Sequence, residues 1–169
     1  MTSEKADLLQ ALAQHRFLLL RTVRDLDDGQ AAKRTTVSEL TLGGLIKHVA
    51  SVETSWINFV QDGPTAMSSL GAPSEEDVAR WTNQFRMADG ETLAGLLAEY
   101  DEVARRTEEV VNALPDLDVS HPLPPAPWFE PGAKWSARRV LVHIVAETSQ
   151  HAGHADIIRE SLDGAKSMG

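Results

Sequence analysis

Residues 140–162 have the sequence VLVHIVAETSQHAGHADIIRESL, and the spacing of its apolar side chains indicates how the chain folds. At about 100° per residue, one narrow helix face carries the side chains of residues 140, 144, 147, 151, 155, 158 and 162. That face is apolar except at Glu147 and His151, which lie one helical turn apart and point the same way. A buried carboxylate and imidazole need a polar partner or a metal ion, because unpaired burial is costly.

Three other long segments have apolar side chains at helical spacing, and the last of them is the most regular. They cover residues 3–27, 41–61 and 93–114. The first is expected to end at Asp27-Asp28-Gly29 and the second at Asp62-Gly63-Pro64. Thr41 and Ser136 are predicted to cap the second helix and the last helix, because a hydroxyl there accepts from free backbone N–H groups. The last helix is predicted to run to about residue 162.

Two shorter regions complete the chain. Ser74 is predicted to cap a short helix with an acidic first turn, and this helix holds Trp81 and Phe85. Residues 115–134 contain six prolines, too many for a helix or a central strand, and form a long loop. No segment alternates with period two, so no strands are expected. The predicted fold is all-α: one domain over residues 1–169, a four-helix bundle with one short extra helix and a long Pro-rich loop before the last helix.

Composition narrows the classes of partner. The chain has 169 residues and a formal net charge of −9, which opposes binding to the phosphates of nucleic acids and to anionic membranes. No window approaches the roughly 18 apolar residues of a spanning helix, and the first residues lack the pattern of a secretory signal. We therefore expect a cytoplasmic protein without a nucleic-acid or membrane partner.

The chain contains no cysteine. Disulfides, thiolate metal ligands and a cysteine nucleophile are therefore excluded, and any thiol chemistry would use a thiol from outside. A metal site must be built from histidine, aspartate, glutamate and water.

Three side chains make the candidate metal site. His48 lies at the margin of the apolar face of the second helix, and with Glu147 and His151 it would supply two imidazoles and one carboxylate. Three such ligands leave an open position, as in catalytic zinc sites. The alternative is a structural polar layer in which Glu147 and His151 pair with each other or with an arginine. The candidate arginines are Arg138, Arg139 and Arg159.

The remaining histidines have simpler interpretations. His143 is expected to lie at the flank of the last helix, although it is also a substitute ligand. His154 is expected to support His151 or to hydrogen-bond Asp156. His15 is expected to be a core histidine whose ring nitrogens are hydrogen-bonded. The less favoured alternative is that it lines a pocket. Glu53 points well away from His48 and is expected to be solvated or ion-paired.

The chain resembles the DinB-like metalloproteins in two blocks. Thr41-Leu42-Gly43-Gly44-Leu45-Ile46-Lys47-His48-Val49, followed by Glu53 and Trp56, resembles the first ligand helix of that family. Trp135-Ser136, Leu141-Val142-His143 and the segment 147–156 resemble the second ligand helix. Both blocks are similar to an actinobacterial branch related to mycothiol-dependent maleylpyruvate isomerase and the mycothiol S-transferases.

The resemblance implies a four-helix bundle, often dimeric, with a divalent metal that is commonly zinc or nickel. Carried over to this chain, the ligands are His48, Glu147 and His151. Many members have histidine at the position of Glu147, whereas the isomerase-like and transferase-like members have the His, Glu, His set. The name of the family refers to a DNA-damage response, but the acidic charge of this chain argues against a DNA partner.

The implied function is metal-dependent thiol chemistry. The expected divalent metal is zinc, with nickel as the alternative. Such a metal lowers the pKa of a bound thiol, and mycothiol would then attack an electrophile as a thiolate. We expect an S-transferase or a thiol-dependent isomerase, acting on small molecules as a homodimer. Trp128 and Phe129 on the Pro-rich loop could close over an apolar electrophile, whereas Trp56 and Trp135 are expected to pack the core. The alternatives are a hydrolase that activates water and a non-catalytic bundle with a structural polar layer.

Overall fold

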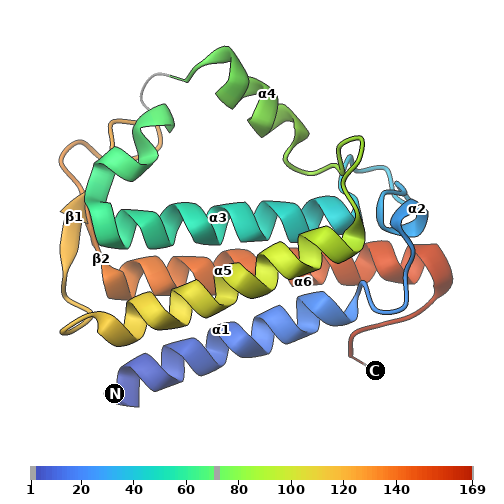
Figure 1. Ribbon diagram of the computed structural model, residues 1–169, viewed down its shortest axis with the longest axis horizontal. Helices are drawn as coiled ribbons and strands as arrows, with labels where there is room; N and C mark the ends of the chain where they lie inside the picture. The colour runs from blue at the N-terminus through green and yellow to red at the C-terminus, as the bar shows by residue number, and fades with distance from the viewer. Residues whose placement is uncertain (1–2, 71–72, 169) are drawn as a thin grey trace.

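Four long helices form a bundle, as the sequence predicted, and the computed structural model describes residues 3–70 and 73–168 (Figure 1). The long helices are α1 (Ser3–Arg21), α3 (Leu42–Asp62), α5 (Leu93–Ala113) and α6 (Ala137–Asp163). Helix α1 packs mainly on α6, and α3 packs on both α5 and α6. The smaller elements are α2 (Asp28–Ala31), the 3-10 helix η1 (Gly63–Leu70), α4 (Glu75–Asn83), β1 (Ser120–Pro122) and β2 (Lys134–Ser136).

The core consists of two clusters of buried apolar side chains along the bundle. One contains Leu45 and Val49 of α3 with Ala152 of α6, and the other contains Trp56 of α3 with Ile144 of α6. The polar residues in the middle of α3 and of α6 therefore lie between the two apolar clusters. Within the described residues, none of the helices has the length and apolar character needed to cross a membrane.

The helix starts agree with the sequence prediction, because local capping determines them. Thr41, Ser74 and Ser136 each accept a hydrogen bond from a backbone N–H of the first turn. Ser74 and Asp77 complete a capping box at α4. Gly164 ends α6 in the left-handed conformation.

The predicted end of the first helix is wrong. Helix α1 stops at Arg21, and Asp27 caps the separate short helix α2 instead of ending α1. The guanidinium of Arg159 donates to the carbonyls of Thr22 (2.9 Å) and Arg24 (2.8 Å), which a longer helix would have used internally. A contact with a residue far along the chain thus ends the helix while the apolar spacing continues.

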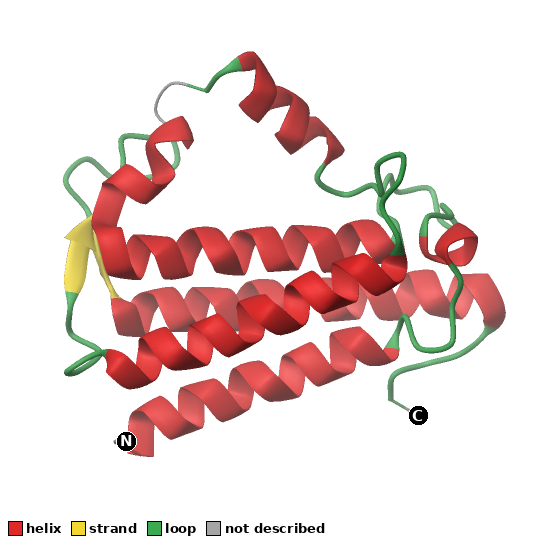
Figure 2. Ribbon diagram, in the orientation of Figure 1, coloured by secondary structure: helices red, strands yellow, loops and turns green. Residues whose placement is uncertain are grey.

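The prediction of no strands is also wrong. β1 and β2 pair antiparallel, with His121 opposite Trp135, and the ladder joins the two ends of the Pro-rich loop (Figure 2). Three residues are too few to show an alternating pattern, so the pairing left no signal in the sequence. Residues 63–70, after the predicted end of the second helix, form η1. Phe85, predicted to lie in the short helix, lies just beyond the end of α4.

Gly44 allows the chain after α4 to lie directly against the start of α3. A Cβ at Gly44 would overlap the backbone carbonyl of Phe85, whereas a Cβ at Gly153 would have nothing within 4 Å. We expect Gly44→Ala to destabilise the protein by about 1–3 kcal/mol, because backbone must move, and Gly153→Ala to stabilise it by up to about 1 kcal/mol. Denaturant unfolding of both variants checks this. Equal effects of the two substitutions would contradict the close approach at Gly44.

Candidate metal centre

Helices α3 and α6 bring the three predicted ligands together. His48 Nε2 lies 4.0 Å from Glu147 Oε2, and His151 Nε2 lies 3.6 Å from the same oxygen. One donor atom from each residue lies within 4.8 Å of the others, and this is the one such group of histidine and acidic residues among those described. The side chains of His48 and His151 are 10% exposed and that of Glu147 is 28% exposed. The cluster is therefore shielded but reachable.

These spacings suit a shared cation better than mutual hydrogen bonds. Distances of 3.6 and 4.0 Å are too long for hydrogen bonds. Around a tetrahedral zinc with bonds of about 2.0–2.1 Å, neighbouring donor atoms are about 3.3 Å apart. A small contraction would give that geometry, and two imidazoles with one carboxylate are a donor set that divalent transition metals accept.

The second nitrogen of each imidazole faces a group that orients the ring. His48 Nδ1 lies 2.9 Å from Gln84 Oε1, an oxygen that only accepts, so Nδ1 donates and Nε2 keeps a lone pair. His151 Nδ1 lies 3.4 Å from Nδ1 of His154. Contacts of this kind fix the orientation of ligand imidazoles in metal sites.

Burial keeps the imidazoles neutral. It is the main cause that lowers the pKa of His48, where His151 lowers it further while Gln84 and Glu147 oppose the change. Burial also lowers the pKa of His151, and His154 adds to that effect. A neutral imidazole is the form that binds a metal ion, so protons compete weakly for these lone pairs near neutral pH.

The three arginines named as possible partners in the polar-layer alternative contact other groups. Arg138 pairs with Glu4 and Asp118. Arg159 donates to Asp163 (2.9 Å), in addition to the two carbonyls beyond α1. The guanidinium of Arg139 lies 4.1 Å from the centre of the Trp135 ring. None of these three contacts reaches Glu147, so they do not form a polar layer with it.

A cavity of about 400 Å³ opens beside the predicted ligands. His48 and Glu147 line it, together with the aromatic residues Trp56, Trp81, Trp128, Phe129 and Trp135. The Pro-rich loop supplies two of these rings, as expected from the sequence.

His143 has a larger role than the helix flank predicted for it. It lines the cavity, its Nε2 lies 4.0 Å from Glu147 Oε1, and its ring meets the rings of Trp56 and Trp135 edge-on at 5.0 and 5.2 Å. Burial lowers its pKa, although the charge of Glu147 acts in the opposite direction. The sequence placed His143 beside the ligand face but could not indicate the tryptophans that surround it.

The other histidine and acid predictions have mixed outcomes. His154 contacts His151, whereas Asp156 accepts from the backbone of Ser167 instead of from His154. His15 is half-buried on α1 and is not among the residues that line the cavity. Glu53 is fully buried, so the solvated alternative is wrong and the ion-paired one is right.

Glu53 belongs to a buried polar cluster on the other side of α3. Arg16 of α1 pairs with it, with one bond from Nε to Oε2 of 3.2 Å, and Thr107 of α5 donates to it. The side chain of Arg16 is 7% exposed and that of Glu53 is 0% exposed. The pair therefore joins three helices inside the bundle.

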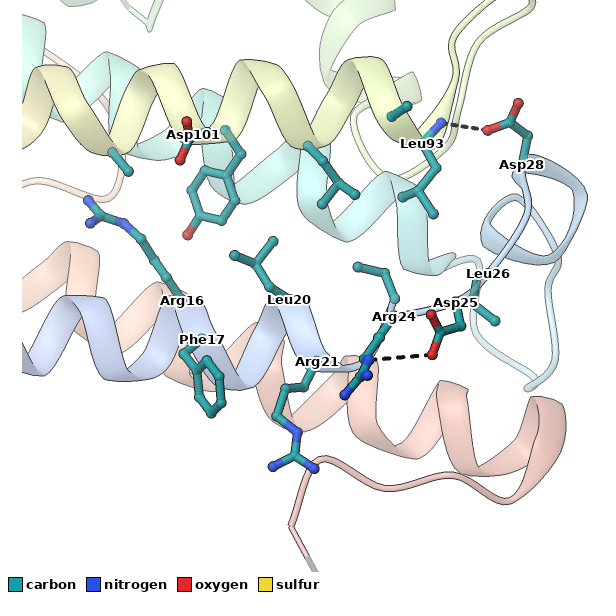
Figure 3. Close-up of a pocket in the computed structure, with 15 residues that line it drawn as sticks. Arg16, Phe17, Leu20, Arg21, Arg24, Asp25, Leu26, Asp28, Leu93 and Asp101 are labelled. Atoms are coloured by element: carbon teal, nitrogen blue, oxygen red, sulfur yellow. Dashed lines mark hydrogen bonds and ion pairs between the residues drawn. The ribbon is translucent and has the colours of Figure 1, made fainter.

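A larger cavity of about 830 Å³ lies between α1 and the first half of α5 (Figure 3). Its walls include Leu20 and Leu93, with Arg24 and Asp25 paired at its edge. No histidine lines this cavity in the part of the chain that the structure describes. It lacks imidazole donors, so the candidate chemistry lies at the smaller cavity.

Comparison with known proteins agrees with the resemblance seen in the sequence. A family model described as mycothiol S-transferase matches residues 7–164. A search of curated proteins found no match. The matched residues include both helices that carry the predicted ligands and nearly all of the bundle, so the chain belongs to the mycothiol S-transferase family, a DinB-like family.

Proposed function

We propose that this protein is a metal-dependent S-transferase that uses mycothiol, with His48, Glu147 and His151 as the metal ligands. The main support is the convergence of two imidazoles and one carboxylate, with His48 and Glu147 of this group on the wall of a cavity. Membership of the mycothiol S-transferase family supports the thiol and the type of reaction. The absence of cysteine means that the thiol comes from solution.

The site residues fit this role in distinct ways. The proposed cation is zinc, with nickel as the alternative. Its positive charge lowers the pKa of a bound thiol, so the thiol ionises near neutral pH. The neutral imidazoles of His48 and His151 each offer a lone pair to the metal, and Gln84 and His154 orient the two rings. The carboxylate of Glu147 offsets part of the cation charge. The aromatic walls of the cavity exclude water from the electrophile.

Zinc reconstitution combined with a test of thiol dependence checks the proposal. Chelator-treated protein should lose conjugation of mycothiol to an electrophile, and stoichiometric zinc or nickel should restore it. Consumption of mycothiol indicates transfer, whereas its regeneration indicates the isomerase alternative. Turnover with metal but without thiol would instead support a hydrolase. If the protein shows no turnover with or without added metal, and chelation leaves the melting temperature unchanged, the bundle is non-catalytic, since a metal bound by the native state alone raises its stability.

Three further features are proposals that rest on the sequence and the resemblance. We propose one domain over residues 1–169, a homodimer and a cytoplasmic location. Sedimentation of the purified protein tests the dimer.

A further inference from the structure

Three of the aromatic side chains that line the smaller cavity pack against one another. The rings of Trp56 and Trp135 stack at 4.6 Å with an interplanar angle of 14°. The guanidinium of Arg139 also stacks on Trp135. Phe129 meets both tryptophans edge-on. These rings contact each other, so their faces are largely unavailable to a ligand.

Two other tryptophans line the same cavity without such packing. Trp81 comes from α4, is half-buried and contacts no other aromatic ring among the described residues. Trp128 comes from the Pro-rich loop, is 63% exposed and, within residues 3–70 and 73–168, meets one other aromatic ring, that of Phe129, edge-on at 6.0 Å. Figure 1 shows α4 apart from the four long helices, on the side of α3 away from α1. Indole is a large apolar surface, and two loosely packed indoles at one cavity are available to stack on a ligand.

The charge of the cavity limits which ligands fit. No lysine or arginine is among its lining residues, as far as the structure describes them, and Glu147 contributes a carboxylate. Away from the proposed metal, an anionic ligand would lose hydration at these walls without gaining a side chain of opposite charge. A volume of about 400 Å³ admits a small ring system beside the metal ligands.

We propose that Trp81 and Trp128 determine specificity by stacking on the electrophile, and that the electrophile is a planar, uncharged aromatic molecule. This inference rests on the proposed function. In the reaction, the mycothiol sulfur forms a bond to a ring carbon, the leaving group departs with its bonding electron pair, and the thiol proton goes to solvent. An electron-poor ring stacks favourably on electron-rich indole, so the walls select the rings that thiolates attack most readily.

The stacking role of the two tryptophans can be tested with an aromatic ligand that has no leaving group, because its binding requires neither metal nor thiol. Chelator-treated protein is titrated with 1,3-dinitrobenzene by calorimetry. Trp81→Leu and Trp128→Leu should each weaken binding roughly tenfold, in the range found for ring stacking on aromatic side chains. Trp81→Phe and Trp128→Phe should retain most of the affinity, because they keep a ring. Phe17→Leu is the control for binding elsewhere: Phe17 is 58% exposed and lines the larger cavity, so the affinity should not change, and a loss in this variant alone would overturn the inference.

Anion binding and kinetics separate this inference from its alternatives. Maleate should bind the same chelator-treated protein far more weakly than 1,3-dinitrobenzene, and equal affinity would overturn the inference. With 1-chloro-2,4-dinitrobenzene as electrophile, the leucine variants should raise the KM for the electrophile and leave the KM for mycothiol unchanged. If the KM for mycothiol rises instead, the indoles hold the sugar rings of the thiol and the inference fails. Binding of dinitrobenzene without turnover would support the inference while contradicting the proposed function.

Discussion

His151→Ala is expected to reduce bound metal from about one ion per chain to traces and to lower the rate of thiol transfer on the order of a thousandfold. The alanine removes one of three donors, and a metal-activated nucleophile lowers the barrier by several kcal/mol. His143 Nε2 lies 4.0 Å from the other oxygen of Glu147, so this imidazole would have to move to replace the lost donor. Elemental analysis of the purified protein and a mycothiol conjugation assay measure the two effects.

Two variants calibrate this result. His15→Ala removes a half-buried histidine of α1 that does not line the cavity, so metal content should stay near one ion per chain. Gln84→Ala removes the acceptor for His48 Nδ1 and should weaken metal binding by about 10- to 100-fold, as seen for groups that orient ligands. If the His151 variant retains both metal and thiol transfer, the proposed ligand set is wrong.

Glu53→Leu is expected to cost about 3–5 kcal/mol of folding stability without changing metal content. The substitution leaves the guanidinium of Arg16 and the hydroxyl of Thr107 without their acceptor inside the bundle. A buried charge that loses its partner is costly, since it is neither solvated nor paired. For a chain of this size, the melting temperature should fall by roughly 10 °C. Denaturant unfolding and elemental analysis measure stability and metal content.

A double variant shows whether the loss comes from the unpaired charge. Arg16→Met combined with Glu53→Leu removes both charges and keeps similar volumes, so most of the lost stability should return. Glu53→Gln keeps acceptor and shape but not the charge, and it should have an intermediate effect. A double variant as unstable as Glu53→Leu would show that packing, and not the unpaired guanidinium, determines the loss.

The parts of the fold that the sequence predicted depend on local patterns. Thr41, Ser74 and Ser136 cap helices through hydrogen bonds within their own first turn, so each cap could be recognised without the rest of the chain. Glu147 and His151 were brought to one face by helical spacing alone. The end of α1 was not predictable in this way, because Arg159 contacts it from the opposite end of the chain.

The surroundings of the site depend on residues far apart in sequence. Nothing near Gln84 in the sequence marks it as the partner of His48, since that contact depends on how the segment after α4 crosses α3. Glu53 was ambiguous for a related reason. Helix α3 packs on both α5 and α6, so one of its faces meets the cavity and another meets Arg16 and Thr107. When a helix is buried on two faces, a polar residue outside its main apolar face can also be buried. A pattern that assumes one buried face would assign that residue to solvent.

The hydrogen bond between His48 and Gln84 links a proposed metal ligand to the segment that carries part of the aromatic wall. Gln84 follows α4 directly, and α4 also carries Trp81. Any shift of this segment that a bound ring favours also changes how firmly the imidazole of His48 is held. Reciprocity then requires that the metal alters the affinity for the ring by the same factor as the ring alters the affinity for the metal.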